Sequence, residues 1–195
     1  MDTMRSFIAI ELPQALRAEL GNLQNKLQTP RQTWIKWVVP ESVHLTLKFL
    51  GDVSIDKIEE IVTAIEEASS EIIQFKLKVQ ELGVFPNLSR IRVIWVGLTG
   101  DLDRLQILQK NIEENMEILG FPAEERKFTP HLTLGRVRFQ PPSPDLEKFT
   151  RLIEMTKFVS SSEIDVDTVN LMKSELTPKG AIYSKIASIK LKTFS

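Results

Sequence analysis

The chain has 195 residues, of which 42% are hydrophobic and 26% are charged, and we expect one globular domain or two closely packed lobes over residues 1–195 instead of a string of modules. Twenty-five Lys and Arg residues against 26 Asp and Glu residues give a net charge of −1, which excludes a chain-wide attraction to polyanions or anionic membranes. Because the chain has no cysteine, disulfides, thiolate catalysis and zinc sites built on cysteine are also excluded.

The first quarter of the sequence predicts a strand, a helix and a pair of strands. Alternating apolar residues over 6–11 predict the strand, and Pro13 lies where the helix can begin. We expect the helix to end at Pro30 and to bury one stripe of leucines, namely Leu16, Leu20, Leu23 and Leu27. The β-rich runs 33–39 and 42–50 then predict two strands that pair with each other and end at Gly51 and Asp52.

The next segment predicts a second helix and two further strands. Ser54 is a suitable N-cap for a helix whose apolar side includes Ile55, Ile58, Ile61, Val62 and Ile65. Strands are expected over 75–79 and 91–96, and the segment 83–87 between them is rich in turn residues.

Two more helices are expected in the second half of the chain. Asp101 opens the third helix, and Gly120 lies where a C′ glycine would end it. A strand over 130–138 follows. Ser143 then caps the fourth helix and Pro144 starts it.

The last elements are two alternating strands over 164–172 and 182–191, joined by a turn at 178–180. The total is about eight strands and four helices in mixed order, which predicts an α+β fold with helices packed against antiparallel or mixed sheets. No segment resembles a signal peptide or reaches the roughly 18 apolar residues of a membrane span. We expect a soluble, cytoplasmic, monomeric protein.

The chain contains two histidines, and both open the same tetrapeptide: His44-Leu45-Thr46-Leu47 and His131-Leu132-Thr133-Leu134. At average composition, chance agreement of the three following residues has a probability of roughly 10⁻⁴ to 10⁻³. We infer an internal duplication that has retained function.

The period of a strand gives this repeat its chemical meaning. His44 and Thr46 project from one face of their strand while the leucines project from the other, and the same holds for His131 and Thr133. If the two halves face each other, two imidazoles can flank one substrate atom, which is the arrangement needed for concerted acid and base catalysis.

Two other interpretations of the histidines are weaker. Each could be an ordinary strand residue, but the repeat argues against that. Two imidazoles also leave a zinc or iron site short of ligands, and no pattern such as HExxH completes it, so we expect no metal and no cofactor.

The segments 43–51 and 128–136 resemble the paired His-x-Thr motifs of the 2H phosphoesterase superfamily, and more narrowly its RNA 2′,3′-cyclic phosphodiesterase branch, also called 2′-5′ RNA ligase. The resemblance extends over nearly the whole chain, through residues 5–10, 83–86, 92–97 and 180–183. It implies two pseudo-symmetric lobes of β-sheet with helices outside and a central cleft.

The resemblance also implies a reaction, the metal-independent hydrolysis of RNA 2′,3′-cyclic phosphate ends to 2′-phosphomonoesters, a step in RNA processing. His44 would then be the proton donor and His131 the proton acceptor, although nothing in the two motifs themselves distinguishes them. The same site could also join RNA ends by 2′-5′ ligation, because a 5′-hydroxyl would replace water.

Other residues are candidates for substrate binding. The hydroxyls of Thr46 and Thr133 can donate to phosphate oxygens. Arg136 can clamp a phosphate oxygen, but strict alternation puts it on the leucine face, so this role requires a bulge or a strand end at Gly135. Lys48 continues the His44 face, where it either meets the RNA backbone or lies in solvent.

Several aromatic residues could stack on a terminal base, with core packing favoured for each one. They are Trp34, Trp37, Phe49, Phe85, Trp95 and Tyr183.

Two alternative functions remain open. One is a non-catalytic module that binds RNA ends or nucleotide phosphates. The other is a phosphodiesterase for small cyclic nucleotides, which would be indifferent to RNA length.

Overall fold

The computed structural model describes residues 2–29, 32–177 and 180–193, and nine strands in these residues form two antiparallel sheets. The four-stranded sheet has the order β3-β1-β8-β9, and the five-stranded sheet has the order β2-β6-β5-β4-β7. The strands are β1 Thr3–Glu11, β2 Ile35–Trp37, β3 His44–Ser54, β4 Phe75–Asn87, β5 Arg90–Gly100, β6 His131–Val137, β7 Val159–Val166, β8 Thr168–Thr177 and β9 Gly180–Lys190. The α-helices described are α1 Gln14–Leu27, α2 Ile58–Ser69, α3 Leu102–Ile118 and α4 Ser143–Met155. The α+β class is confirmed.

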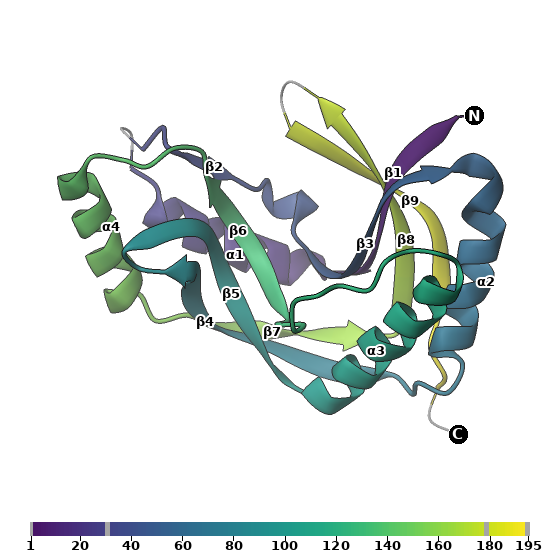
Figure 1. The fold of residues 1–195 in the computed structure, drawn as a ribbon. Coiled ribbons are helices and arrows are strands. Elements are labelled where there is room, and N and C mark those ends of the chain that lie inside the picture. Colours follow the sequence, from purple (N-terminus) through teal and green to yellow (C-terminus); the bar gives the residue numbers. More distant parts are fainter. Residues whose placement is uncertain (1, 30–31, 178–179, 194–195) are drawn as a thin grey trace.

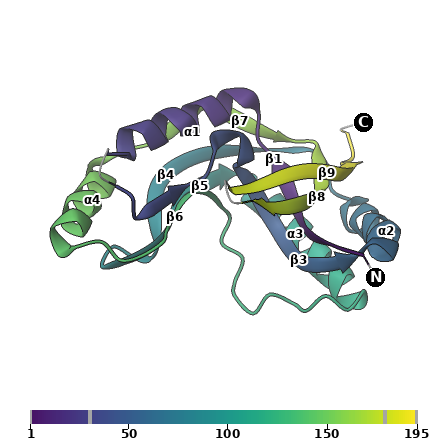
Figure 2. The same cartoon turned by 90° about the horizontal axis from the view of Figure 1, so that it is seen from above.

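Two helices pack on the sheet opposite to the one that contains the strand before them. Helix α1 follows β1 of the four-stranded sheet but packs on β7 of the five-stranded sheet, and α3 follows β5 but packs on α2 and β3. In both views, α2 and α3 lie together at one end of the molecule and α4 at the other (Figure 1 and Figure 2). The result is two lobes tied by their helices, with one hydrophobic cluster running through both.

Several local predictions are confirmed. The leucine stripe of α1 is buried as expected. Asp101 directly precedes α3, and Gly120 has a φ of +85° just after the helix, a left-handed conformation that favours glycine. Pro30 and the turn residues Pro178 and Lys179 lie outside the described residues. No helix in the described part of the chain combines the length and the apolarity that a membrane span requires.

The predicted pairing of strands 33–39 and 42–50 is wrong. Strand β2 pairs with β6, and β3 pairs with β1 in the other sheet. The turn signal between them is a 3-10 turn, Pro40–Ser42, that leads the chain from one sheet to the other. Neighbourhood in sequence suggested a hairpin, but the segment crosses between the lobes.

Two predicted strand ends are also wrong. Strand β3 continues past Gly51 to Ser54, and β4 continues through the expected turn at 83–87 to Asn87, paired with β5 along this length. The glycine at position 83 has a packing reason, because a Cβ there would lie 2.3 Å from the Trp95 ring.

The single strand expected over 164–172 is two strands in different sheets. The buried residues Ile164 and Val166 belong to β7, whereas Val169 and Leu171 belong to β8. The apolar alternation slips by one position between Val166 and Val169, and the chain changes sheets there.

Two helix starts differ from the predicted ones. Ser54 precedes a 3-10 turn, Ile55–Lys57, and its hydroxyl bonds to the Asp56 carboxylate instead of capping α2, which begins at Ile58. Helix α4 begins at Ser143 with Pro142 at the N-cap, one residue earlier than expected.

Lys48 neither meets solvent nor lies on the His44 face. Its side chain is only 3% exposed and forms an ion pair with Glu113 of α3, and its ammonium also donates to the Pro122 carbonyl at 2.9 Å. The Glu113 carboxylate in turn accepts from the backbone N–H of Glu124 at 3.4 Å. The pair therefore fixes the segment that leads from α3 towards His131.

Breaking this buried pair should destabilise the protein. We expect Lys48→Met to lower the free energy of unfolding by about 3–5 kcal/mol, because the Glu113 carboxylate loses its partner. Adding Glu113→Gln should restore part of the loss. Lys78→Met, which removes an exposed partner of Glu163, serves as the control and should cost no more than about 1 kcal/mol. Urea unfolding measures all of them, and equal losses for Lys48→Met and Lys78→Met would contradict the prediction.

Candidate active site

Both histidines are the first residue of a strand, His44 of β3 and His131 of β6. Leu45 and Leu132, the next residues, are completely buried in the core. The histidines and the two threonines are half-buried. Strand geometry thus anchors each repeat by its leucine face and leaves an imidazole and a hydroxyl together on the opposite face, as predicted.

Each repeat contains a register shift at its fourth residue. In β3, Ala9 pairs with Thr46 and Ile8 with Lys48, so that Leu47 has no direct partner in β1. In β6, Trp95 pairs with Thr133 and Ile94 with Gly135, so that Leu134 is the unpaired residue. A bulge of one residue reverses the faces that follow it.

The bulge in β6 brings Arg136 to the histidine face. Arg136 pairs with Val93, Thr133 with Trp95 and His131 with Gly97. Since the three partners are alternate residues of β5, these three side chains share one face of the sheet. The condition that the sequence set for Arg136 is met.

The bulge in β3 has the opposite effect on Lys48. Because Lys48 pairs with Ile8, which is buried, it turns to the core face, and Phe49 takes the position beside Thr46. Phe49 is 64% exposed. Strict alternation therefore gave the wrong face for Lys48 for the same reason that it gave the wrong face for Arg136.

A buried glutamine holds the bulge in β6. The carbonyl of Leu134 accepts one hydrogen bond from the Gln24 amide at 2.9 Å and a second from the Val38 backbone N–H at 2.8 Å. The Gln24 amide also donates to the Val38 carbonyl at 2.6 Å. Gln24 is 2% exposed, and its side chain joins α1, the segment before β3 and the bulge. The sequence alone does not single out Gln24, because a Gln on a helix is usually a surface residue.

The two imidazoles are held in the same way. His44 Nδ1 lies 2.8 Å from the Ser42 carbonyl, and His131 Nδ1 lies 2.7 Å from the Thr129 carbonyl, each two residues upstream. A carbonyl only accepts, so Nδ1 carries the hydrogen and Nε2 is the free nitrogen in the neutral ring. The two histidines therefore have the same tautomer and are oriented by the same hydrogen bond.

The positive charge of Arg136 affects both histidines. It lowers the pKa of both His44 and His131, and β3 and β6 are in contact. Arg136 forms no ion pair within the described residues. One guanidinium of the five-stranded sheet therefore acts on an imidazole from each sheet.

Aromatic rings surround both histidines. Phe7 and Tyr183 lie 4.7 Å and 5.0 Å from the His44 ring, and Phe85 lies 5.1 Å from the His131 ring, measured between centroids. Trp95 packs on Phe85 at 5.0 Å. Phe7 was missed, because nothing separates an aromatic residue of a buried strand from core packing in sequence.

The two remaining aromatic candidates pack on the core. Trp34 is 5% exposed and contacts Phe149 edge-on at 5.2 Å. Trp37 packs against the core cluster. Core packing, the favoured alternative, explains both.

Burial is the main cause of the shifted pKa of each histidine. It lowers the pKa of His44 and His131 below the ordinary value of 6.5, and the carbonyls at Nδ1 offset part of the effect. Arg17 and Arg136 lower the pKa of His44 further, while the Glu11 carboxylate raises it. Neither threonine hydroxyl is hydrogen-bonded within the described part of the chain. The site therefore presents two imidazoles whose pKa is lowered, two free hydroxyls and a guanidinium.

Neither of the two surface pockets described contains a histidine; one is lined by Arg90, Arg92 and residues 137–140 and the other by residues from 109 to 128. The central cleft expected from the resemblance is not among them, so the side chains named above define the candidate site.

Removing the shared charge should change both titrations. We expect Arg136→Gln to raise the pKa of His44 and of His131, because a nearby positive charge no longer opposes the protonation of each ring. Arg136→Lys keeps the charge and should leave both values close to those of the unmodified protein. NMR titration of the imidazole resonances measures them, and a shift confined to His131 would show that Arg136 does not face both rings.

Comparison with known proteins places this arrangement in a class. The sequence profile of the family described as "LigT like Phosphoesterase" matches residues 10–95 and again residues 96–183, so each match contains one His-x-Thr repeat. A Methanocaldococcus jannaschii protein named RNA 2′,3′-cyclic phosphodiesterase is 37% identical over 94% of this chain and 98% of its own length. A Methanothermobacter thermautotrophicus protein of the same name is 34% identical over 96% and 99%.

Solved structures agree on the fold. A crystal structure of a Thermus thermophilus protein superposes with a TM-score of 0.79 at 26% identity and covers 96% of this chain and 98% of its own. The Escherichia coli LigT structure, solved in complex with 3′-AMP, gives a TM-score of 0.78 at 22% identity over 97% and 99%. The fold and the paired motifs define a two-lobed 2H phosphoesterase. The chain belongs to the LigT-like phosphoesterase family, which confirms the resemblance seen in the sequence.

Proposed function

We propose that this protein hydrolyses the 2′,3′-cyclic phosphate ends of RNA to 2′-phosphomonoesters, with two histidines as acid and base and with no metal. The observation that carries the proposal is the pair of imidazoles, each bonded through Nδ1 to a backbone carbonyl and both under the charge of Arg136. The name shared by relatives that align with more than nine-tenths of this chain supports the RNA substrate. Residues 1–195 would act as one bilobal domain.

In the proposed reaction, water attacks phosphorus in line with the departing O3′. His131 Nε2 accepts a proton from the water as the new P–O bond forms. His44, protonated at Nε2, gives its proton to O3′ as the P–O3′ bond breaks. The net change is the addition of one water, and the phosphate remains on O2′. The assignment of donor and acceptor follows the family resemblance.

The other site residues would bind the phosphate. Negative charge grows on its non-bridging oxygens during the reaction. The hydroxyls of Thr46 and Thr133 have no partner of their own in the described residues and could donate to these oxygens from the two sheets, with Arg136 supplying a charged donor. Bound phosphate would also raise the pKa of both histidines, because an anion favours the protonated ring.

Ligation of RNA ends through a 2′-5′ bond would use the same residues, with a 5′-hydroxyl in place of water. It stays a prediction, as do the monomeric state and the cytoplasmic location. Cleavage of small cyclic nucleotides and binding without turnover are distinguished from the proposed function by the experiments below.

Removal of either imidazole should abolish most of the activity. We expect His44→Ala and His131→Ala each to lower the turnover of an RNA with a 2′,3′-cyclic phosphate end by about 10²–10⁴-fold. Circular dichroism checks that both variants fold. As a matched control, Trp34→Phe alters an aromatic residue of the core and should keep its turnover, and the wild-type enzyme should keep its activity in EDTA. If either single variant still turns over the RNA at the wild-type rate, the acid–base pair is refuted.

The pH dependence follows from the direction of the two pKa shifts. A neutral His131 is lost as the pH falls through its lowered pKa, and a protonated His44 is lost as the pH rises through its own lowered pKa. The profile of kcat/KM should therefore be a bell with its maximum below pH 6.5. The profile of kcat should have its maximum at a higher pH, because bound phosphate raises both values. A single ionisation in kcat/KM would contradict two working imidazoles.

A further inference from the structure

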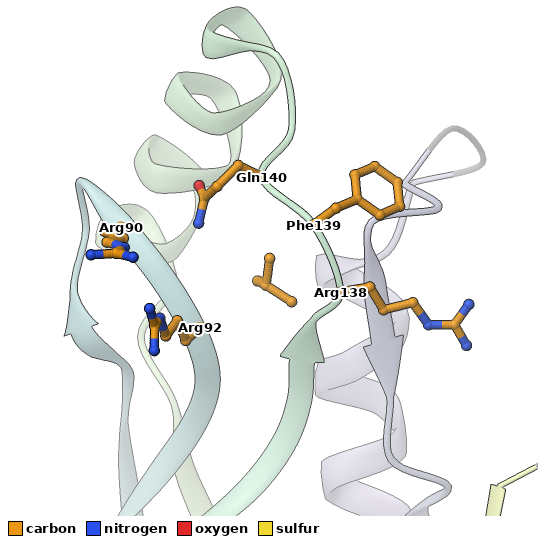
Figure 3. Close-up of a pocket in the computed structure, with 6 residues that line it drawn as sticks. Arg90, Arg92, Arg138, Phe139 and Gln140 are labelled. Carbon is orange, nitrogen blue, oxygen red and sulfur yellow. The ribbon is translucent and has the colours of Figure 1, made fainter.

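A second positively charged site lies on the same sheet as His131. It is an open pocket of about 390 Å³ lined by Arg90, Arg92, Val137, Arg138, Phe139 and Gln140. Figure 3 shows Arg90 and Arg92 one above the other on β5, across the pocket from the segment 138–140 that follows β6. The lining contains arginine but no acidic residue.

The arginines of the pocket have no carboxylate partners. Arg90, Arg92 and Arg138 are exposed, and none of them forms an ion pair within residues 2–29, 32–177 and 180–193. The guanidinium of Arg138 points away from the pocket, so Arg90 and Arg92 supply its charge (Figure 3). In a protein with a net charge of −1, such a grouping favours a ligand with negative charge.

The register connects this pocket to the histidines. Val93 pairs with Arg136, and the next residue, Arg92, is unpaired because the pairing with β4 shifts from Val93↔Phe85 to Ile91↔Pro86. A bulge of this kind changes the direction of a side chain, here near the end of the central strand β5. Arg92 thus lies next along β5 from the position opposite Arg136.

Phe139 also lines the pocket and is 55% exposed, but its ring, like the Arg138 guanidinium, extends from the segment 138–140 away from Arg90 and Arg92 (Figure 3). The binding capacity of the pocket therefore rests on the two guanidinium groups, which are the groups by which proteins contact the phosphates of single strands.

We propose that Arg90 and Arg92 bind the phosphodiester backbone of the RNA upstream of its cyclic phosphate end. The inference rests on the proposed function, and it adds that the preferred substrate is an oligonucleotide. Arg138 is the seventh residue after His131, a distance of at most about 23 Å along an extended strand. A stacked strand spaces its phosphates by about 3.4 Å, so that an RNA of about eight nucleotides reaches from the histidines into the pocket.

The test compares two substrates in three proteins. The substrates are adenosine 2′,3′-cyclic phosphate and an RNA of about eight nucleotides that ends in the same group, a length chosen to span the pocket. The proteins are the wild type, Arg90→Ala/Arg92→Ala and a charge-matched control, Lys57→Ala/Lys110→Ala, whose exposed lysines lie on the 3-10 turn before α2 and on α3. We expect the arginine variant to lower kcat/KM for the RNA by about tenfold and to leave the mononucleotide unchanged. The control should change neither.

Binding of the same RNA, measured by fluorescence anisotropy, tests the pocket without turnover. The slope of log affinity against log salt concentration should fall by about 1.4 in the arginine variant, since each phosphate contact of a single strand contributes roughly 0.7. Equal effects on both substrates, or RNA binding that is unchanged in the arginine variant, would overturn the inference. If inorganic phosphate binds the pocket while RNA affinity does not depend on the two arginines, the pocket is a free-anion site and the inference is also overturned. Wild-type enzyme inactive on both substrates would refute the proposed function instead, and the anisotropy measurement would still decide the role of the pocket.

Discussion

The bulge at the fourth residue of each His-x-Thr-Leu repeat is the constraint on which the candidate site depends. Up to that residue the two repeats are equivalent, with histidine and threonine on one face and leucine on the other. After it the faces are reversed, so that Gly135 and Lys48 turn to the core side and Arg136 and Phe49 to the histidine side. An extended β6 without the bulge would bury a guanidinium in the core, at a high desolvation cost. The Gln24 amide and the Val38 N–H stabilise the bulge because they satisfy the Leu134 carbonyl, which the irregular pairing affects.

The same constraint explains how a duplicated structure acquires an asymmetric site. Phe49 and Arg136 occupy equivalent positions in the two repeats, so one repeat contributes a ring and the other a charge. Opposite His44 in the neighbouring strand lies Glu11, whereas Gly97 lies opposite His131. The carboxylate of Glu11 also pairs with Arg17 and Lys185, which limits its effect on His44. Identical histidines thus lie in unlike surroundings, and this is the physical basis on which they could take different roles.

The sequence predicts the residues that carry the chemistry better than it predicts their neighbours. The repeat, the faces of its strands and the leucine anchors follow from the period of two, which is a local property. The pairing partner of β3 does not follow from a local property, because β3 could join either sheet and the nearest strand in sequence, β2, belongs to the other sheet. Lys48 and Arg136 depend on a single inserted residue, and composition carries no signal for it. The boundary between β7 and β8, in contrast, does have a signal in the sequence. The apolar residues Ile164 and Val166 are at even positions and Val169 and Leu171 are at odd ones, and this change of parity marks the point where the chain changes sheets.

Local charge, more than net charge, determines what this molecule can bind. Lysines 76 and 78 on β4 are neutralised by carboxylates of the neighbouring strand, as in the 2.7 Å pair of Lys76 with Asp165. Arg90 and Arg92 on β5 and Arg136 on β6 have no such partners in the described part of the chain. Pairing on one side of the sheet and its absence on the other concentrate positive charge in a band that begins beside the histidines. A guanidinium without a carboxylate loses no ion pair when it binds phosphate, so its full Coulombic interaction is available to an RNA strand. A protein with an overall charge near zero can therefore still bind a polyanion along this band, because the arginines of the band have no acidic residues beside them.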